Sequence, residues 1–242
     1  MIDLHSHILP GIDDGAPNLE AAVEMARIAV ESGVKIVVAT PHCAQDRTDE
    51  VYSTWKLLQS ALLELDIPLK IGLGMEILGT RRTVQLLRDN RMFTINQSRY
   101  PLVEFRFHSD GLEETTVIRD LLRYGYRPIV AHPERYGFVQ NDPAIINEWF
   151  HMGCLFQINR GSLLGRFGAA AQSCSAQLVG RGFATIVASD AHSPVIRTPW
   201  LDDVRELLAE EYSPETAEDL LLRNPSRILQ NQEINPATPD WF

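Results

Sequence analysis

The stretch Ile2-Asp3-Leu4-His5-Ser6-His7 is a short β-rich run that ends in two histidines. Further β-rich runs follow it along the chain at residues 34–40, 69–75, 101–107, 127–131, 154–158 and 183–188. Several of them are almost continuously apolar, which is typical of strands buried on both faces of a parallel sheet.

Helical patterns separate these runs. Residues 17–32 carry apolar side chains at helical spacing, begin with Pro17 near the first turn and close at Gly33. Further helices are predicted at 48–65, 78–90, 112–124, 143–152, 167–181, 200–211 and 214–223. Seven strand–helix units with short connections predict an α/β fold, a distorted seven-stranded (β/α) barrel. An open doubly wound sheet is the alternative, but no glycine-rich phosphate-binding motif follows the first strand.

The chain has the size of one domain. It has 242 residues, of which 45% are hydrophobic, so we predict a single domain over 1–242 with a short C-terminal tail after about residue 230. The net charge of −10 argues against a nucleic-acid partner, because no excess of cations is left to neutralise a polyanion. A single phosphate remains an acceptable ligand where bound metal supplies the positive charge.

The cysteines and the N-terminal region indicate a compartment. Three cysteines at wide spacing form no paired framework, which favours a reducing environment. The first residues have neither the basic nor the apolar region of a signal peptide. No apolar run approaches the roughly 20 residues that span a bilayer. We therefore expect a soluble, cytoplasmic protein without membrane insertion.

Ionisable side chains stand at the ends of most predicted strands. In a parallel barrel all strand carboxyl ends lie at one face, where barrel enzymes place their sites. Imidazole and carboxylate ligands suit Zn, Mn or Fe, and a carboxylate can bridge two ions. The candidate ligands are His5, His7, Asp14, His42, Glu76, Glu104, His132, Asp190 and His192. They are too many for one tetrahedral ion and suit a cluster of two or three metals.

Each candidate also has an ordinary interpretation. A single histidine at a strand end is more often a hydrogen-bonded surface residue, although the joint pattern is hard to assemble by chance. Asp14 has a rival role, because Asp-Asp-Gly is a good turn sequence. Glu104 is a stronger candidate, because a carboxylate within a buried strand is costly unless it is neutralised. His108 and His151 lie outside the pattern and are interpreted as structural.

A second chemical motif competes with the metal hypothesis. Cys154 and Arg160 have the spacing of the Cys-x5-Arg loop of cysteine-dependent tyrosine phosphatases. That loop binds phosphate through successive backbone N–H groups at a helix N-terminus. Here the intervening residues are predicted to form a buried strand, so this mechanism is rejected. Cys43 is expected near the site because it follows His42, but no base for it is evident.

Together these segments resemble the polymerase-and-histidinol-phosphatase (PHP) superfamily, and within it the bacterial manganese-dependent tyrosine phosphatases that regulate capsule synthesis. The resemblance runs from residue 1 to about 230 and rests on Asp3-Leu-His5-Ser-His7-Ile-Leu-Pro-Gly-Ile-Asp-Asp14-Gly15, Thr40-Pro-His42, Gly74-Met-Glu76, Val103-Glu104-Phe105, Ile129-Val-Ala-His132-Pro-Glu-Arg135-Tyr136, Ala188-Ser-Asp190-Ala-His192 and Asn224-Pro-Ser-Arg-Ile-Leu229. It implies a distorted seven-stranded barrel with a trinuclear metal site.

The resemblance also implies roles for individual residues. The first ion would be held by His5, His7, Glu76 and Asp190; the second by His42, Glu76 and His132, with Glu76 bridging; and the third by Asp14, Glu104 and His192. Arg135 matches the arginine that contacts phosphate, and Arg197 is a second candidate. The loops at 44–50 and 193–199 depart from the family pattern and bear on substrate preference.

The function implied is a metal-dependent phosphomonoesterase acting on phosphotyrosine protein in exopolysaccharide or capsule synthesis. Hydroxide held between the ions would attack phosphorus. Three divalent ions are expected, manganese first, with Fe, Co or Zn also acceptable to these ligands. The expected partner is a phosphotyrosine protein such as a bacterial tyrosine kinase.

Two other enzyme classes remain open. One is a PHP phosphatase of a small molecule such as histidinol phosphate; the other is a TatD-like metal nuclease or an amidohydrolase. A metal-binding regulatory protein without activity is disfavoured, because Arg135 accompanies the full set of candidate ligands. The sequence leaves the oligomeric state open. The aromatic tail ending in Trp241-Phe242 is expected either to fold back on the barrel or to form a subunit contact.

Overall fold

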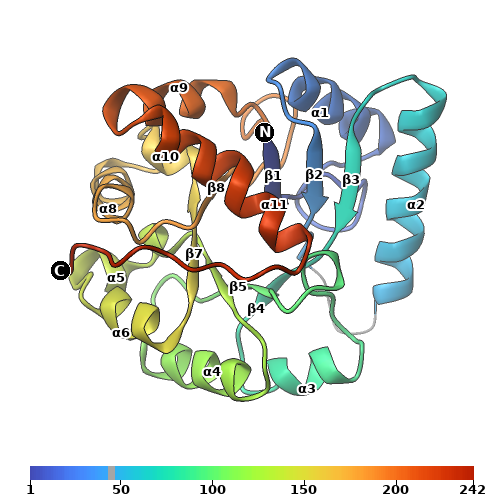
Figure 1. The fold of residues 1–242 in the computed structure, drawn as a ribbon. Helices are drawn as coiled ribbons and strands as arrows, with labels where there is room; N and C mark the ends of the chain where they lie inside the picture. The colour runs from blue at the N-terminus through green and yellow to red at the C-terminus, as the bar shows by residue number, and fades with distance from the viewer. Residues whose placement is uncertain (43–46) are drawn as a thin grey trace.

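The strands of this computed structural model, which describes residues 1–42 and 47–242, form two parallel sheets (Figure 1). The first sheet contains β1 (Ile2–Ser6), β2 (Ile36–Ala39) and β3 (Lys70–Leu73), in that order. The second contains, also in chain order, β4 (Glu76–Leu78), β5 (Leu102–Glu104), β6 (Ile129–Ala131), β7 (Leu155–Asn159) and β8 (Ile186–Ala188). Cys43, expected near the site, lies outside the described residues.

The α/β class and the parallel strands are confirmed, but the single seven-stranded barrel is not. The predicted strand 69–75 is divided, because β3 ends at Leu73 paired with β2 while β4 begins at Glu76 paired with β5. Isolated bridges connect the sheets at both edges, between Ser6 and Ala191 and between His42 and Glu76. The strands of the described residues therefore form two sheets joined by isolated bridges, and they do not form one continuous closed sheet.

Helices lie around the outside of the strands (Figure 1). Their bounds are α1 (Leu19–Glu31), α2 (Thr48–Glu64), α3 (Thr83–Arg88), α4 (Leu112–Arg123), α5 (Gly137–Asn141), α6 (Ile145–Met152), α7 (Arg160–Leu163), α8 (Ala169–Gly180), α9 (Asp202–Glu211), α10 (Pro214–Glu218) and α11 (Asn224–Leu229). The chain also forms two 3-10 turns, η1 (Ile95–Gln97) and η2 (Pro133–Arg135), and a π-helical segment, η3 (Asp219–Arg223). Helix α1 starts after its cap Asn18, whose side chain accepts from the Ala21 N–H, so Pro17 precedes the cap and does not lie in the first turn as expected. Gly33 ends it with a φ of +86°.

Alternate strand residues pack on opposite faces. In β6, Val130 belongs to the large apolar cluster beneath the helices, whereas Ile129 and Ala131 belong to a smaller cluster with Leu4 and Leu102. Both faces are therefore buried, which explains why these strands are almost continuously apolar.

The C-terminal tail folds back on the molecule, which was one of the two alternatives expected for it. The Tyr100 hydroxyl donates to the Gln232 carbonyl at 2.6 Å. At the end of the chain, Trp241 stacks on His151 and Phe242 on Phe183.

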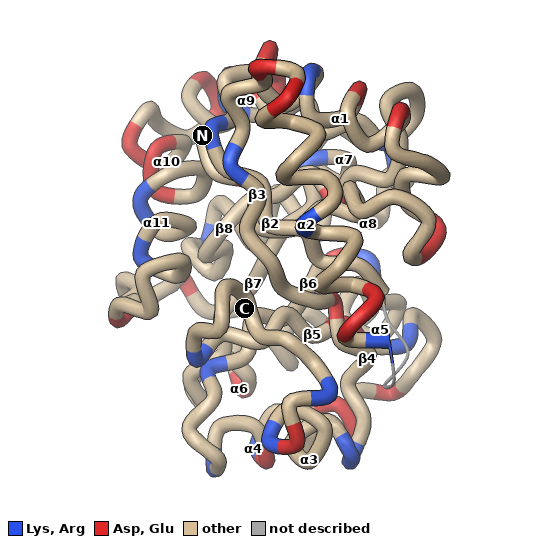
Figure 2. Tube along the Cα trace, turned by 90° about the vertical axis from the view of Figure 1, so that its right-hand side faces the viewer, with Lys and Arg blue, Asp and Glu red and all other residues tan. Residues whose placement is uncertain are grey.

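Lys and Arg are interspersed with Asp and Glu along the trace (Figure 2). Among the described residues, none of the helices combines the length and the apolar composition needed to cross a membrane.

Candidate metal centre

The histidines at the end of β1 meet two carboxylates in the interior. Because His5 and His7 are two residues apart on an extended chain, both project to the same side. Their Nε2 atoms lie 3.3 Å apart, and 3.1 and 3.2 Å from Glu76 Oε2. Asp190 Oδ1 lies 3.4 and 3.5 Å from the same two nitrogens. All four side chains are buried, and together they form one group that could hold a metal ion.

The Nδ1 atoms of both histidines also have hydrogen-bond partners. His5 Nδ1 lies 2.9 Å from Gln157 Oε1, and His7 Nδ1 lies 2.7 Å from Asp13 Oδ2. Since both oxygens are acceptors, each Nδ1 donates its proton to its partner, and each Nε2 faces the carboxylates. Outer hydrogen bonds of this kind orient the histidine ligands of metal sites. The residues therefore fit a divalent cation.

Without a metal, protons hold this cluster together. Burial lowers the pKa of His7, but hydrogen bonds with Asp13 and Glu76 outweigh it and raise that pKa to about 10. Burial raises the pKa of Glu76, but the charges of His5 and His132 bring it well below its ordinary value. A divalent ion would take the place of these protons between the same groups.

Glu76 has neighbours on its other side as well. Its Oε1 atom lies 2.7 Å from His132 Nε2. His42 Nδ1 lies 3.5 Å from Glu76 Oε2 and 3.2 Å from Glu104 Oε1, which makes His42, Glu76 and Glu104 a second possible metal group. Glu76 thus lies between two sets of histidines, as a bridging carboxylate would. Glu104, which the resemblance groups with Asp14 and His192, lies against His42.

A third possible group consists of His7, Asp14, His42 and His192. His192 Nε2 lies 3.6 Å from Asp14 Oδ1, and its Nδ1 lies 3.0 Å from the Asp190 carbonyl. Burial and the neighbouring His7 charge lower the pKa of His192 to about 4. Asp14 is largely exposed, so this group opens to solvent. All nine predicted ligands therefore come together in one region.

Both arginines reach the same region. Arg135 Nη1 lies 3.3 Å from Asp190 Oδ2, and Arg197 forms an ion pair with the same oxygen. The Arg135 guanidinium also lies against two aromatic rings, 4.8 Å from the centre of Phe107 and 4.4 Å from that of Phe167. These rings limit where the guanidinium can point.

Backbone conformation contributes to the same geometry. His132 and Asp190 have positive φ angles of 35° and 52°, which non-glycine residues rarely adopt and which often mark functional sites. Gly15 packs against the backbone of His7, where a Cβ atom would stand 2.0 Å from the carbonyl oxygen. Asp13 and Asp14 are thereby brought to the end of β1.

Sequence reasoning missed several residues that orient the predicted ligands. Asp13 holds His7, and Gln157 holds His5. Asn159 Nδ2 donates to Asp190 Oδ2 at 2.6 Å and its Oδ1 accepts from Gln157. Two polar residues at period two in an apolar strand were the available signal for Gln157 and Asn159. No signal in the sequence pointed to Phe107 or Phe167.

The rejection of the cysteine mechanism is confirmed. The residues between Cys154 and Arg160 form β7, whose N–H groups belong to its neighbours. Cys154 is buried, and burial raises its pKa well above the ordinary value of a thiol. Arg160 forms an ion pair with Asp203.

Known proteins share this sequence and fold. The chain is 34% identical to the tyrosine-protein phosphatase YwqE of Bacillus subtilis (strain 168), covering 97% of this chain and 93% of that protein. It is 28% identical to the tyrosine-protein phosphatase CpsB of Streptococcus pneumoniae, covering 97% and 100%. A crystal structure from work on YwqE and CpsB, described as unique metal-dependent tyrosine phosphatases, matches with a TM-score of 0.95 at 33% identity, covering 100% of this chain and 99% of that one.

The family comparison agrees with the resemblance found in the sequence. The family model described as capsular polysaccharide synthesis, CpsB/CapC, matches residues 1–230. That match leaves out residues 231–242, the C-terminal tail. On this match, the chain belongs to the CpsB/CapC family.

Proposed function

We infer that this chain is a metal-dependent protein tyrosine phosphatase of capsular polysaccharide synthesis. The observation that carries this conclusion is the convergence of His5, His7, Glu76 and Asp190 on one buried point, with both arginines beside it. The relatives named as tyrosine-protein phosphatases over almost their whole length support the same activity.

The metal complement is part of the proposal. Three divalent ions, manganese first, would be held by His5, His7, Asp14, His42, Glu76, Glu104, His132, Asp190 and His192. When bound, such ions activate water for attack on phosphorus and neutralise phosphate charge. The proximity of these ligand atoms and the fixed Nδ1 atoms of His5 and His7 support this assignment.

The protein's own cations would act on the phosphate. Arg135 and Arg197 share Asp190 Oδ2, so each can turn a donor toward a phosphate oxygen beside the cluster. Such donors stabilise the charge on the equatorial oxygens as the ester bond breaks. A tyrosine leaving group has a conjugate-acid pKa of about 10, so it needs less proton donation than an alkyl alcohol.

The proposal also covers the domain, the compartment and the substrate of this enzyme. Residues 1–242 would act as one catalytic domain, with the two bridged sheets serving as a distorted barrel. The protein would work in the cytoplasm on a phosphotyrosine protein such as a bacterial tyrosine kinase. The acidic net charge favours a single phosphate on the metal cluster over a nucleic acid.

Phosphate release from three substrates tests the function. A phosphotyrosine peptide, histidinol phosphate and single-stranded DNA are each incubated with the protein and Mn²⁺, with chelator, or with a thiol alkylator. We expect turnover of the peptide in Mn²⁺, loss of turnover in chelator, and resistance to alkylation because Cys154 is buried. Activity that survives chelator but not alkylator would overturn the metal mechanism, and cleavage of DNA alone would indicate a nuclease.

The arginine roles have their own test. We expect Arg135→Met and Arg197→Met each to lower kcat on the phosphotyrosine peptide by about 100-fold, because each removes a donor to the transition state. Arg181→Met, which changes an arginine paired with Asp240 in the tail, is the matched control. A kcat equal to that of the wild type in either site variant would exclude that residue from the chemistry.

A further inference from the structure

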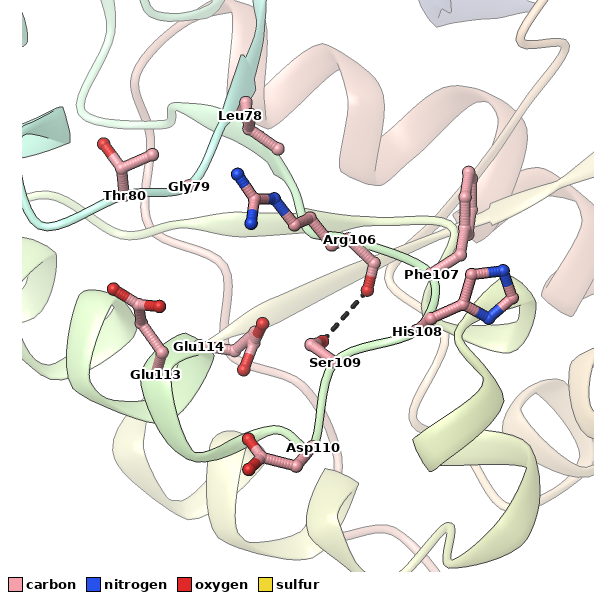
Figure 3. A pocket seen from close by; sticks show the side chains of 10 residues that line it. All are labelled: Leu78, Gly79, Thr80, Arg106, Phe107, His108, Ser109, Asp110, Glu113 and Glu114. Carbon is pink, nitrogen blue, oxygen red and sulfur yellow. Dashed lines mark hydrogen bonds between the residues drawn. The ribbon is translucent and has the colours of Figure 1, made fainter.

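A pocket of about 760 Å³ lies beside the candidate metal centre (Figure 3). Its walls come from the end of β4, the segment after β5 and the first turn of α4. Two contacts place it next to the centre: the Gly79 N–H donates to the Glu104 carbonyl at 2.8 Å, and Phe107, which lines the pocket, packs against the His132 ring. A segment of substrate that leaves the centre on this side would enter the pocket.

Glu114 is the unusual residue of this pocket. It is only 6% exposed, and its Oε2 atom is buried without a hydrogen-bond partner. In Figure 3 its carboxylate points into the pocket. Within the described part of the chain, the Glu114 side chain has neither a hydrogen bond nor an ion pair, and a buried carboxylate in that condition is costly.

The other charged residues of the pocket leave Glu114 uncompensated. Glu113 pairs with Arg81 at 3.5 Å, and Asp110 accepts from the Leu112 N–H at 3.1 Å. The guanidinium of Arg106 extends toward Leu78, away from Glu114 (Figure 3). The pocket therefore holds three carboxylates against one guanidinium, and the most buried of them is without a partner.

The place of Glu114 on its helix argues against a purely structural role. It is followed at helical spacing by Val117, Ile118 and Leu121, which are buried. Glu114 therefore occupies the first position of the buried stripe of α4, where an apolar residue would pack at no electrostatic cost. Glu114 lies in the first turn of α4, where acidic residues are favourable. A buried carboxylate without a partner is suited to bind a cation.

We propose that this pocket binds a lysine or arginine side chain of the phosphoprotein substrate, close in sequence to the phosphotyrosine, with Glu114 as its counter-ion. This proposal rests on the proposed function, because the pocket adjoins the centre that would hold the phosphate. Its volume lies in the range of ordinary ligand pockets. Leu78 and Phe107 offer apolar surface for the methylene stem of a long cationic side chain.

A peptide scan tests the proposal. Each phosphotyrosine peptide of the set has a Gly/Ala/Ser background and a single lysine. The position of that lysine varies from three residues before to three residues after the phosphotyrosine. Matched peptides carry uncharged norleucine there instead. The kcat/KM of each peptide is divided by that of p-nitrophenyl phosphate for the same enzyme. We expect wild-type protein to favour lysine over norleucine by on the order of 10-fold at one position, the gain of a charge-assisted hydrogen bond.

Variants assign the preference to Glu114. Glu114→Gln should lose the preference for lysine, and the exposed Glu210→Gln on α9 is the matched control that should keep it. No preference in wild-type protein, a preference for norleucine, or a lysine preference that survives in Glu114→Gln would overturn the proposal. The wild-type scan alone decides the matter if Glu114→Gln does not fold. Wild-type protein that turns over neither p-nitrophenyl phosphate nor any peptide would instead overturn the proposed function.

Discussion

His7 is held on both ring nitrogens, and Asp13 is the reason it points inward. The Asp13 Oδ2 atom lies 2.7 Å from His7 Nδ1 and accepts from the His42 N–H at 2.8 Å, while its Oδ1 accepts from the Gly15 N–H at 3.0 Å. One carboxylate therefore fixes two predicted ligands and the turn between them. The sequence pattern suggested a ligand role for Asp14 and none for Asp13, and only the contacts reveal Asp13 as a positioning acid.

Replacing Asp13 by alanine tests this role. We expect Asp13→Ala to weaken Mn²⁺ binding by about 10- to 100-fold, the usual cost of losing a partner behind a metal ligand. Titration of the protein with Mn²⁺, followed by phosphate release, measures the change. Asp89→Ala, at an exposed acid after α3, is the matched control and should bind Mn²⁺ as the wild type does. Wild-type affinity in Asp13→Ala would contradict the role.

The protons on the cluster predict how pH affects stability. Since the pKa of His7 rises from 6.5 to about 10 on folding, its contribution to metal-free stability is complete below pH 6.5 and is lost as pH rises toward 10. Metal binding must displace the same protons, so affinity rises with pH. We expect the Mn²⁺-induced increase in Tm to grow between pH 6.5 and 8.5, measured by thermal unfolding with Mn²⁺ and with chelator. An increase that shrinks over this range would refute the assignment.

At the scale of elements, the positions of strand breaks matter most. The run 69–75 reads as one strand, because a local pattern does not reveal which neighbour each residue pairs with. In the structure the chain changes partners between Leu73 and Glu76, so Glu76 opens a strand where the prediction had it close one. Glu76 still reaches the site, because it forms a bridge with His42, which lies three residues beyond the end of β2.

The turn after β1 is tightly packed at Gly15. Gly15→Ala would place a Cβ atom 2.0 Å from the His7 carbonyl and 2.5 Å from its Cβ. We expect displacement of the turn that carries Asp13 and Asp14, loss of Mn²⁺-dependent turnover, and a decrease of about 1–3 kcal/mol in the free energy of unfolding.

Denaturant unfolding and phosphate release measure both effects of Gly15→Ala. Gly180→Ala on α8 is the control, because its added Cβ would lie 3.5 Å from Tyr212, an ordinary contact. That variant should be neutral or more stable, since alanine is the better helix former. Normal turnover in Gly15→Ala would show that the turn can shift without cost.

At the scale of the whole molecule, the last residues close the fold. Trp241 packs against Phe150, His151 and Phe183, and Phe242 stacks on Phe183 with the Arg181 guanidinium 4.6 Å from the Phe242 ring centre. The tail thereby joins α6 to the end of α8. None of these residues belongs to the candidate metal centre.

Removing residues 237–242 tests the contribution of the tail. We expect Tm to fall by about 6 °C, the effect of losing about 2 kcal/mol of aromatic packing in a chain of this size. Phosphotyrosine turnover at 25 °C should remain, because the tail contacts lie away from the ligands. Thermal unfolding measures the change in Tm. The control variant is Leu63→Ala, at an exposed leucine on α2. An unchanged Tm would mean that these contacts contribute nothing to stability.

Residue type and local spacing were enough to reveal the α/β class and the nine candidate ligands, and the motifs that contain these ligands carried the resemblance to the family. These features are local: an apolar run identifies a buried strand, and a histidine two residues from another shares its side. Tertiary contacts were needed to group Glu104 with His42, to divide the strands into two sheets, and to bring Asp13, Gln157, Asn159 and Phe167 to the centre. Those features depend on which distant segments pair and on where each side chain points after pairing, and a one-dimensional pattern carries neither.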